Sequence, residues 1–189
     1  MENSTDEIPI YNPDLLKQLD YAALTNLKYS TPRSPQNPGN SLIMRPLCAA
    51  DYHKGFIELL RQLTSVGDVT PEQFMDHFQQ MKSCNGTYYI TVIEDISISK
   101  IVAAATLVVE RKYIHACATR GMIEEVVVDS GYRGQQLGKL LMDTLTLLSK
   151  HTLGCYKTTL QCTEENIPFY EKFGFKKDPQ VYMQHRHKP

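Results

Sequence analysis

The sequence has no tryptophan, few cysteines and no long apolar run. Its five cysteines are odd in number, scattered and without a CxxC pair, which favours reduced thiols and offers no closely spaced ligands for zinc. The longest nearly apolar run, residues 101–109, has nine residues, whereas a transmembrane helix needs about 20. The first seven residues are acidic and lack an apolar stretch, so we expect no signal peptide and a cytoplasmic protein. Peripheral attachment to endomembranes stays open.

The chain also lacks an excess of charge of either sign. Lys and Arg number 20 against 21 Asp and Glu, which gives a net charge of −1. A general binder of nucleic acid or of membrane surfaces carries a clear basic excess, so the composition argues against both classes. With 189 residues, of which 42% are hydrophobic, the chain has the size and composition of one soluble domain with a sizeable core.

The distribution of proline divides the chain into two parts. Five of the ten prolines fall within residues 1–40, and residues 31–40 contain no apolar side chain other than proline. Such a stretch is typical of an extended linker. We therefore expect residues 1–40 to form a flexible, loosely attached arm, with a short helix that begins near Asn12, and residues 41–189 to form the folded domain.

The hydrophobic pattern of the domain predicts a mixture of strands and helices. Apolar and β-branched runs predict strands over residues 42–47, 87–93, 101–110, 122–128, 156–162 and 182–184. Helical spacing and capping residues predict helices over residues 52–63, 70–82, 136–150 and 166–173, the first with Asp51 as its cap. A short polar turn between the second and third strands favours an antiparallel hairpin. This order predicts an α/β fold of the α+β type, with a mixed, mostly antiparallel central sheet and helices on both faces.

The segment from Val126 to Lys139 carries the strongest functional signal. A β-branched strand passes here through a turn with Gly131 and Gly134 directly into a long helix. The free N–H groups at such a helix start, with Lys139 beside them, favour a phosphate or pyrophosphate ligand. A tight turn that only needs glycine is the alternative. The spacing excludes a P-loop, which needs GxxxxGK[ST], and does not fit the GxGxxG dinucleotide fingerprint.

Two motifs resemble the signatures of the GNAT superfamily of N-acetyltransferases. Arg133-Gly-Gln-Gln-Leu-Gly138 resembles the acetyl-CoA pyrophosphate motif, with Gln136 at a position where the pattern usually has glycine. Residues 166–175 resemble the second signature, an Asn followed by Tyr-Glu-Lys-x-Gly-Phe. Over residues 41–188 the chain further resembles the eukaryotic glucosamine 6-phosphate N-acetyltransferase family, through segments at 63–67, 70–74, 114–128, 133–141, 154–157 and 182–186.

The resemblance implies a complete reaction. It implies transfer of acetyl from acetyl-CoA to the 2-amino group of D-glucosamine 6-phosphate, directly within a ternary complex, as a step of UDP-N-acetylglucosamine biosynthesis. It implies the GNAT fold, with a splayed gap between the cofactor strand and the next strand that admits the pantetheine arm, and a homodimer. It implies no metal, since a backbone N–H of the cofactor strand can polarise the carbonyl.

The same resemblance assigns the site residues. The catalytic residues are Glu124 and Tyr170. The residues expected to bind acetyl-CoA are Val126, Val127, Val128, Gly134, Gln135, Gln136, Leu137, Gly138, Lys139, Asn166 and Tyr170. The residues expected to bind the sugar phosphate are Thr64, Lys112, Tyr113, Ile114, His115, Glu124, Glu125, Val126, Tyr156, Lys157 and Arg186.

Several of these roles have plain structural alternatives. Tyr170 is expected to donate a hydrogen bond or a proton to the departing thiolate, but a tyrosine between two phenylalanines also fits a core. Asn166 also suits a helix cap. Glu124 either removes the amine proton, directly or through water, or orients the sugar, and both it and Glu125 also fit exposed strand-end charges. Because adjacent strand residues point to opposite faces, at most one of the two is expected to face the substrate.

Two other functions stay open at this point. One is a GNAT enzyme for another amine, such as a polyamine, an amino acid or a protein N-terminus. The basic segment 111–120 argues against a cationic acceptor, which would need an acidic pocket. The other is a non-catalytic CoA-binding module, against which the presence of both Glu124 and Tyr170 argues.

Overall fold

A five-stranded mixed sheet forms the centre of the computed structural model, which describes residues 8–21, 33–34 and 36–187. The strands lie in chain order: β1 (Leu42–Pro46), β2 (Tyr88–Asp95), β3 (Lys100–Arg111), β4 (Thr119–Val128) and β5 (Cys155–Leu160). The first three pairings are antiparallel and β4 pairs with β5 in parallel. The predicted mixed, mostly antiparallel sheet and the β2–β3 hairpin are confirmed.

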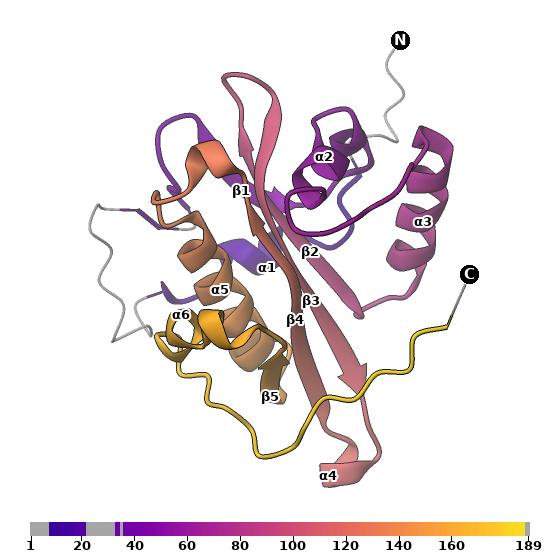
Figure 1. Cartoon of the computed structure of the whole chain (residues 1–189), viewed down its shortest axis with the longest axis vertical. Coiled ribbons are helices and arrows are strands. Elements are labelled where there is room, and N and C mark those ends of the chain that lie inside the picture. The colour runs from indigo at the N-terminus through magenta and orange to yellow at the C-terminus, as the bar shows by residue number, and fades with distance from the viewer. Residues whose placement is uncertain (1–7, 22–32, 35, 188–189) are drawn as a thin grey trace.

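Helices cover both faces of this sheet (Figure 1). On one side lie η2 (Ala49–Tyr52), α2 (Phe56–Leu60) and α3 (Pro71–Ser83). On the other lie α1 (Asp14–Lys17), α5 (Leu137–Leu147) with its π-helical continuation η4 (Leu148–Thr152), η5 (Glu164–Asn166) and α6 (Ile167–Glu171). Within the described ranges, none of these helices has the length and apolar character needed to cross a bilayer.

The helix α3 begins where the sequence predicts it, and the helix before it does not. Thr70 and Gln73 form the expected capping box, with each side chain bonded to the other residue's backbone N–H. The predicted helix over 52–63 is instead split into η2 and α2, because Gly55 has a φ of 79° and interrupts the helical backbone. Asp51 is therefore not the cap of a long helix.

Asp51 belongs to a buried ion network that ties η2 to the sheet. Its carboxylate accepts hydrogen bonds of 2.8 and 2.7 Å from the Arg45 guanidinium, which also binds Glu94 on β2. Lys54 donates to the other oxygen of Glu94 at 2.7 Å. Burial raises the pKa of Glu94, but the hydrogen bonds from Lys54 and Arg45 outweigh it and hold the pKa below its usual value. The network thus pairs two carboxylates with two cations, and this pairing offsets the cost of removing the charges from water.

The main core lies between α5 and the sheet. Leu137, Leu140, Leu141, Leu145 and Leu148 are all buried, as the predicted amphipathic face requires. Burying one such side chain contributes about 1.5–3 kcal/mol relative to its exposed state. These leucines therefore fix the start of α5 firmly against β4.

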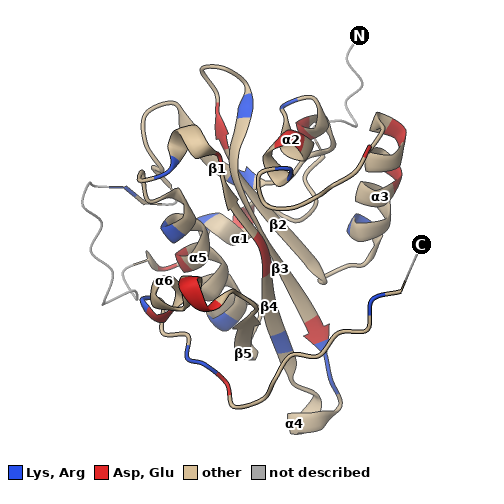
Figure 2. Ribbon diagram, in the orientation of Figure 1, with Lys and Arg blue, Asp and Glu red and all other residues tan. Residues whose placement is uncertain are grey.

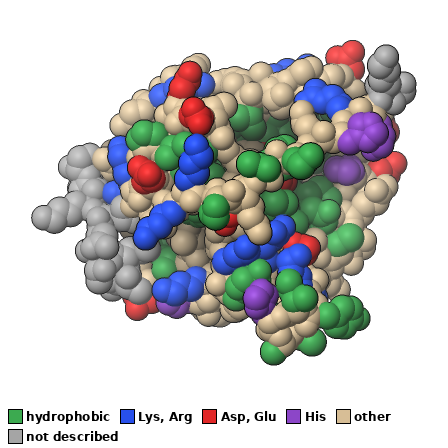
Figure 3. All heavy atoms as spheres, turned by 60° about the horizontal axis from the view of Figure 1, so that its bottom comes forward, with side chains coloured by type: hydrophobic (Ala, Val, Ile, Leu, Met, Phe, Trp, Pro, Cys, Tyr) green, Lys and Arg blue, Asp and Glu red, His purple; other side chains and the backbone are tan. Residues whose placement is uncertain are grey.

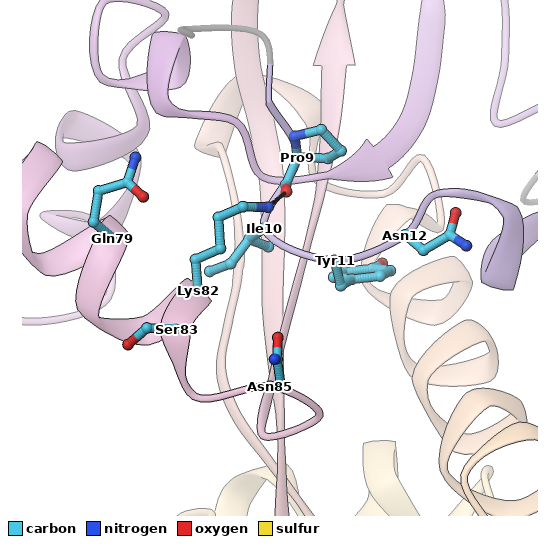
Figure 4. Close-up of a pocket in the computed structure, with 8 residues that line it drawn as sticks. All are labelled: Pro9, Ile10, Tyr11, Asn12, Gln79, Lys82, Ser83 and Asn85. Atoms are coloured by element: carbon cyan, nitrogen blue, oxygen red, sulfur yellow. Dashed lines mark hydrogen bonds between the residues drawn. The ribbon is translucent and has the colours of Figure 1, made fainter.

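The described part of the N-terminal segment packs against the domain. Ile10, Tyr11, Leu16 and Leu19 are buried, and the Tyr11 hydroxyl lies 2.6 Å from that of Thr91 on β2. The backbone next to Ile10 crosses the end of α3, whose Lys82 ammonium donates to the carbonyl of Pro9 beside an open pocket (Figure 4). A loosely attached arm is therefore wrong for residues 8–21, because their apolar side chains complete the core. Residues 1–7, 22–32 and 35 lie outside the described part of the chain, and these include residues 31, 32 and 35 of the proposed linker.

The predicted strand at 182–184 is not formed. Residues 175–187 have no strand or helix, and the side chains of Val181, Tyr182 and Met183 are exposed. Figure 1 shows this tail leaving α6 and ending on the side of the molecule where α3 lies. A strand needs a neighbour to take its hydrogen bonds, and no strand of the described chain pairs with these residues.

Candidate active site

A bulge interrupts β4 at the residues expected to face the substrate. Thr106 pairs with Glu124, and Ala104 pairs with Val127. Between these two pairs β3 has one residue, whereas β4 has two. Glu125 takes up the difference with a φ of 54°, in the left-handed region. The expected strict alternation of Glu124 and Glu125 is therefore wrong, since an extra residue breaks it. Both glutamates are exposed on the surface of the chain.

The bulge coincides with the point where β4 and β5 separate. Their parallel pairing runs from Thr119 and Cys155 to Ile123 and Leu160 and ends there. The backbone of residues 124–128 consequently keeps a free edge toward β5, which is the splayed gap that the resemblance implies. An extended ligand can pair with such an edge as an added strand.

The three valines after the bulge divide between core and gap. Val127 is buried at 5% exposure and contributes to the core, whereas Val126 and Val128 are half-buried. The expected alternation of core positions with more accessible ones along this strand is present in the structure.

The turn from β4 into α5 presents the backbone amides of a helix start. Gly134 and Gln136 have φ values of 79° and 65°, so Gln136 adopts the left-handed conformation that the usual glycine favours. The first intrahelical bond of α5 runs from Leu140 N to Gln136 O. The N–H groups of Leu137 and Gly138 therefore have no partner from a preceding helical turn and lie at the positive end of the helix dipole.

The same turn has room for a bulky anion. A Cβ added at Gly134 would meet no heavy atom within 4 Å. A Cβ added at Gly138 would lie 3.5 Å from the Val128 side chain and 3.7 Å from the Phe169 ring, so this glycine lets α5, β4 and α6 approach closely. Open space over the amides of a helix start fits a pyrophosphate group, and the residues present therefore suit the diphosphate of acetyl-CoA.

The helix α6 carries Tyr170 toward this region. Its neighbour Phe169 packs on Tyr170 with ring centroids 5.0 Å apart and lies next to Gly138 at the start of α5. Burial raises the pKa of Tyr170, and the nearby Cys162 adds to the effect. The phenol is consequently neutral at physiological pH and retains a proton to donate. Tyr170 is half-buried rather than part of the closed core.

Asn166 precedes α6 without capping it. Its side chain makes no capping hydrogen bond to the helix and instead donates to the Thr163 hydroxyl at 3.2 Å. The residue is exposed. The capping alternative for Asn166 is therefore wrong in this conformation.

The predicted sugar-phosphate residues of the β3–β4 connection lie on a projecting hairpin that includes α4 (Ile114–Cys117). Three consecutive residues, His115, Ala116 and Cys117, have positive φ, so α4 is a left-handed turn rather than a regular helix. Tyr113 is 96% exposed. The His115 ring lies 4.8 Å from that of Tyr156 on β5, so the fold joins two residues that are far apart in sequence.

Cations gather at this end of the sheet (Figure 2). Figure 3 shows Lys, Arg and apolar side chains together on the face that carries the hairpin. Lys157 lies with its Nζ 5.7 Å from the Tyr156 ring. Lys112 and Arg120 both bind Glu110, and these contacts, the Lys112 hydrogen bond above all, keep the pKa of Glu110 below its usual value. This group of cations carries less positive charge than the composition of residues 111–120 indicates, because Glu110, the residue just before that segment, pairs with two of them.

One chain does not bring all the expected substrate residues together. The hairpin lies five strand residues from Glu124, about 17 Å at the usual rise per residue. Thr64 lies toward the other end of β4, because Gln62 binds Asp129 there. Arg186 belongs to the exposed tail. The span of about 17 Å between the hairpin and Glu124 is longer than a hexose phosphate.

A long groove follows β5 and α6. It has a volume of about 1130 Å³ and is lined by strand, helix and tail residues that include Tyr156, Lys157 and Tyr170. One side of the groove is the free edge of β5, the last strand of the sheet. The structure therefore leaves an unpaired strand edge beside three of the expected site residues.

Sequence reasoning missed several residues that hold the site. Glu110, Thr106 and Asp129 each bind a predicted site residue or the turn that carries one. Only the position of Asp129, directly after the valine strand, was a usable signal. The contacts of Thr106 with Glu125 and of Glu110 with Arg120 cross from β3 to β4, and the register that aligns them is not visible in a single sequence.

Comparison with known proteins gives concordant matches. Residues 54–175 match the acetyltransferase (GNAT) family. The chain is 48% identical over 177 residues, 93% of its length, to a Drosophila melanogaster protein named as a probable glucosamine 6-phosphate N-acetyltransferase, of which it covers 79%. It is 45% identical over 131 residues, 69% of its length, to the glucosamine 6-phosphate N-acetyltransferase of Arabidopsis thaliana, of which it covers 87%.

The structural comparison agrees with the sequence matches. The crystal structure of the Arabidopsis thaliana glucosamine 6-phosphate N-acetyltransferase superposes with a TM-score of 0.74 at 41% sequence identity. The superposition covers 78% of this chain and 99% of the Arabidopsis chain. The shared part therefore includes nearly all of the solved relative.

Proposed function

The chain belongs to the acetyltransferase (GNAT) family, and we propose that it transfers the acetyl group of acetyl-CoA to the 2-amino group of D-glucosamine 6-phosphate. The observation that carries this proposal is the free edge of β4 after the bulge, which leads directly into the open amide turn before α5. Relatives named for this reaction cover most of the chain.

Acetyl-CoA would lie along the turn and the gap. The amides of residues 134–139 would hold its pyrophosphate, with Lys139 adding a positive charge. The free backbone of Val126 to Val128 would pair with the pantetheine arm, and Asn166 lies at the start of α6 on the other side of the gap. When bound, acetyl-CoA supplies an activated thioester whose acetyl group the amine attacks.

Glu124 and Tyr170 have complementary tasks in this proposal. The attacking amine must be neutral, and the Glu124 carboxylate would take its proton, directly or through water, or orient the sugar. The departing sulfur needs a proton or a hydrogen bond, and the neutral Tyr170 phenol would donate it. Transfer would occur directly, with both substrates bound.

The 6-phosphate needs cations, which Lys112, Lys157 and Arg186 would supply, and His115 would contact the same group as a hydrogen-bond donor. Tyr113, Ile114 and Tyr156 would line the same pocket, and Thr64 would contact the sugar. Lys112 shares Glu110 with Arg120, so binding the phosphate would require it to divide its hydrogen bonds between two anions. A cationic acceptor, such as a polyamine, would meet repulsion here.

We also propose that the enzyme works as a homodimer. The hairpin and Glu124 lie about 17 Å apart along β4 of one chain, so a second copy would complete each site. The free edge of β5 and the exposed tail side chains Val181, Tyr182 and Met183 support this arrangement, because such apolar surface is usually covered. The product would enter UDP-N-acetylglucosamine biosynthesis in the cytoplasm.

A direct assay tests the reaction. The purified chain is mixed with acetyl-CoA and glucosamine 6-phosphate, thiol release is followed by absorbance, and the N-acetylated product is identified by mass spectrometry. Glucosamine without phosphate, spermidine and a free amino acid serve as comparison acceptors. We expect rapid release only with the sugar phosphate. Faster turnover of spermidine, or no release with any amine, would reject the proposal.

A further inference from the structure

Gln62 connects two regions that the proposed function assigns to different substrates. It lies just past the end of α2, two residues before Thr64. Its amide nitrogen donates to Asp129 Oδ2 at 3.1 Å, and its amide oxygen accepts from Ser130 N at 2.9 Å. Both amide atoms are therefore fixed by the turn that follows β4.

Asp129 is the centre of this turn. It is 6% exposed and accepts from the Lys100 ammonium at 2.7 Å and from Gly131 N at 2.9 Å. These contacts, the Lys100 hydrogen bond first, hold its pKa below the usual value against the effect of burial. Asp129 therefore ties the Gln62 side chain, the Lys100 ammonium and the Gly131 amide to one point of the turn.

The turn has a second anchor on the side away from α2. The Tyr132 hydroxyl donates to Asp95 at 2.7 Å, at the end of β2. The turn then continues to Gly134 and the amides before α5. The loop on the other side of Gln62 is tied at its start by the Thr64 N–H, which donates to the Leu60 carbonyl at 3.2 Å, and at its end by the Val69 carbonyl, which accepts from the Tyr52 hydroxyl at 2.8 Å. Residues 64–68 between these points are mostly exposed.

We propose that the Gln62–Asp129–Ser130 contact couples the two substrate sites, so that acetyl-CoA on the amide turn improves the binding of the sugar phosphate at the Thr64 loop. This inference rests on the proposed function. Gln62 is a positioning residue here. It orders the start of the Thr64 loop when the bound diphosphate orders the turn, and by thermodynamic linkage the sugar phosphate improves acetyl-CoA binding by the same factor.

The experiment measures that factor. The Kd of CoA is determined by titration calorimetry with and without glucosamine 6-phosphate, for the wild type and for Gln62→Met. Methionine keeps the length of the side chain but has no amide. We expect the wild-type ratio of the two Kd values to be at least about fivefold and the ratio for Gln62→Met to approach one. Gln79→Met, on the exposed side of α3, is the matched control and should keep the wild-type ratio.

A double variant that moves the negative charge from position 129 to position 62 distinguishes a loss of coupling between the two sites from a general loss of structure. Gln62→Glu places a carboxylate against Asp129, and Asp129→Asn removes the anion that Lys100 needs. In the double variant, the amide introduced at position 129 can donate to the carboxylate introduced at position 62, and one negative charge again faces Lys100. We expect each single variant to lose the ratio and the double variant to regain it. A thermal unfolding scan of each variant verifies that it is folded.

The outcomes are distinguishable. If no variant, including the wild type, binds CoA or releases thiol, the proposed function fails. If the wild type turns over the sugar phosphate but Gln62→Met keeps the wild-type ratio, the coupling inference is overturned while the function stands. The same holds if the double variant stays folded and shows no recovery.

Discussion

The Thr106 hydroxyl donates a 3.1 Å hydrogen bond to the Glu125 carboxylate, at the bulge of β4. Thr106 lies directly opposite Glu124 in the β3–β4 pair, so the sheet holds the second glutamate and leaves the first unbound. The Glu124 carboxylate makes no hydrogen bond within the described part of the chain. The Glu125 carboxylate is therefore held by the sheet, whereas the Glu124 carboxylate can turn toward a substrate.

This difference predicts unequal effects of removing each carboxylate. We expect Glu124→Gln to lower kcat/KM for the sugar phosphate by about 10²-fold, the lower range for a general base. Removing a group that takes the amine proton should also change the pH dependence of kcat/KM. Glu125→Gln keeps an acceptor for Thr106 and should change both quantities little. Equal profiles for the two variants would argue against a proton role for Glu124.

Tyr170→Phe tests the proton donor. Removing the phenol oxygen should lower kcat by about 10²-fold and leave the Kd of acetyl-CoA nearly unchanged, since the ring still packs on Phe169. Burial raises the pKa of Tyr170 above its usual value of 10.0, so the wild-type phenol is protonated near neutrality. Removing the phenol oxygen should therefore not alter the pH profile in that range. Tyr88→Phe on β2 is the control. Full activity of Tyr170→Phe would remove the residue from the mechanism.

Arg186→Ala tests both the phosphate contact and the second subunit. We expect a much larger rise in KM for the sugar phosphate than for acetyl-CoA. If Arg186 acts in the partner's site, equal mixtures of Arg186→Ala and Glu124→Gln chains that exchange subunits should recover about a quarter of the wild-type sites. Sedimentation measurements verify the exchange. No recovery in exchanged dimers would place Arg186 in the site of its own chain.

Gly121→Ala tests the close approach of the helical layer to β4. A Cβ there would lie 2.4 Å from Ser149 Oγ and 3.0 Å from Leu107 Cδ1. Overpacking of this kind typically costs about 1–3 kcal/mol of unfolding free energy, measurable by urea denaturation. Adding Ser149→Ala removes the nearer atom and should recover part of the loss. Ser149→Ala alone is the control for its hydrogen bond to Thr158.

The ion network around Arg45 predicts a loss of stability in acid. The pKa of Glu94 in the folded protein lies below the usual value of 4.5, so the unfolded chain binds this proton first as the pH falls. Its contribution is therefore complete above about pH 4.5 and disappears as the pH drops through the folded pKa. Glu94→Gln should lower Tm at pH 7 and flatten its acid dependence. An unchanged acid dependence in this variant would contradict the assignment.

Local pattern was enough to predict much of this protein. The capping box at Thr70, the leucine face of α5 and the valine strand that enters a glycine turn are all short-range signals, and each element forms where the pattern indicates. The same turn carried the family motif. Such features depend on neighbouring residues along the chain, which a single sequence displays in full.

Tertiary structure decided the relationships between elements. The bulge at Glu125, the bond from Gln62 to Asp129 and the shared acid Glu110 each depend on strand register or on the docking of a helix. The packing of residues 8–21 and the unpaired tail follow from which surfaces the sheet leaves open. Sequence periodicity determines which face of an element is buried, but only the assembled fold determines which element it is buried against.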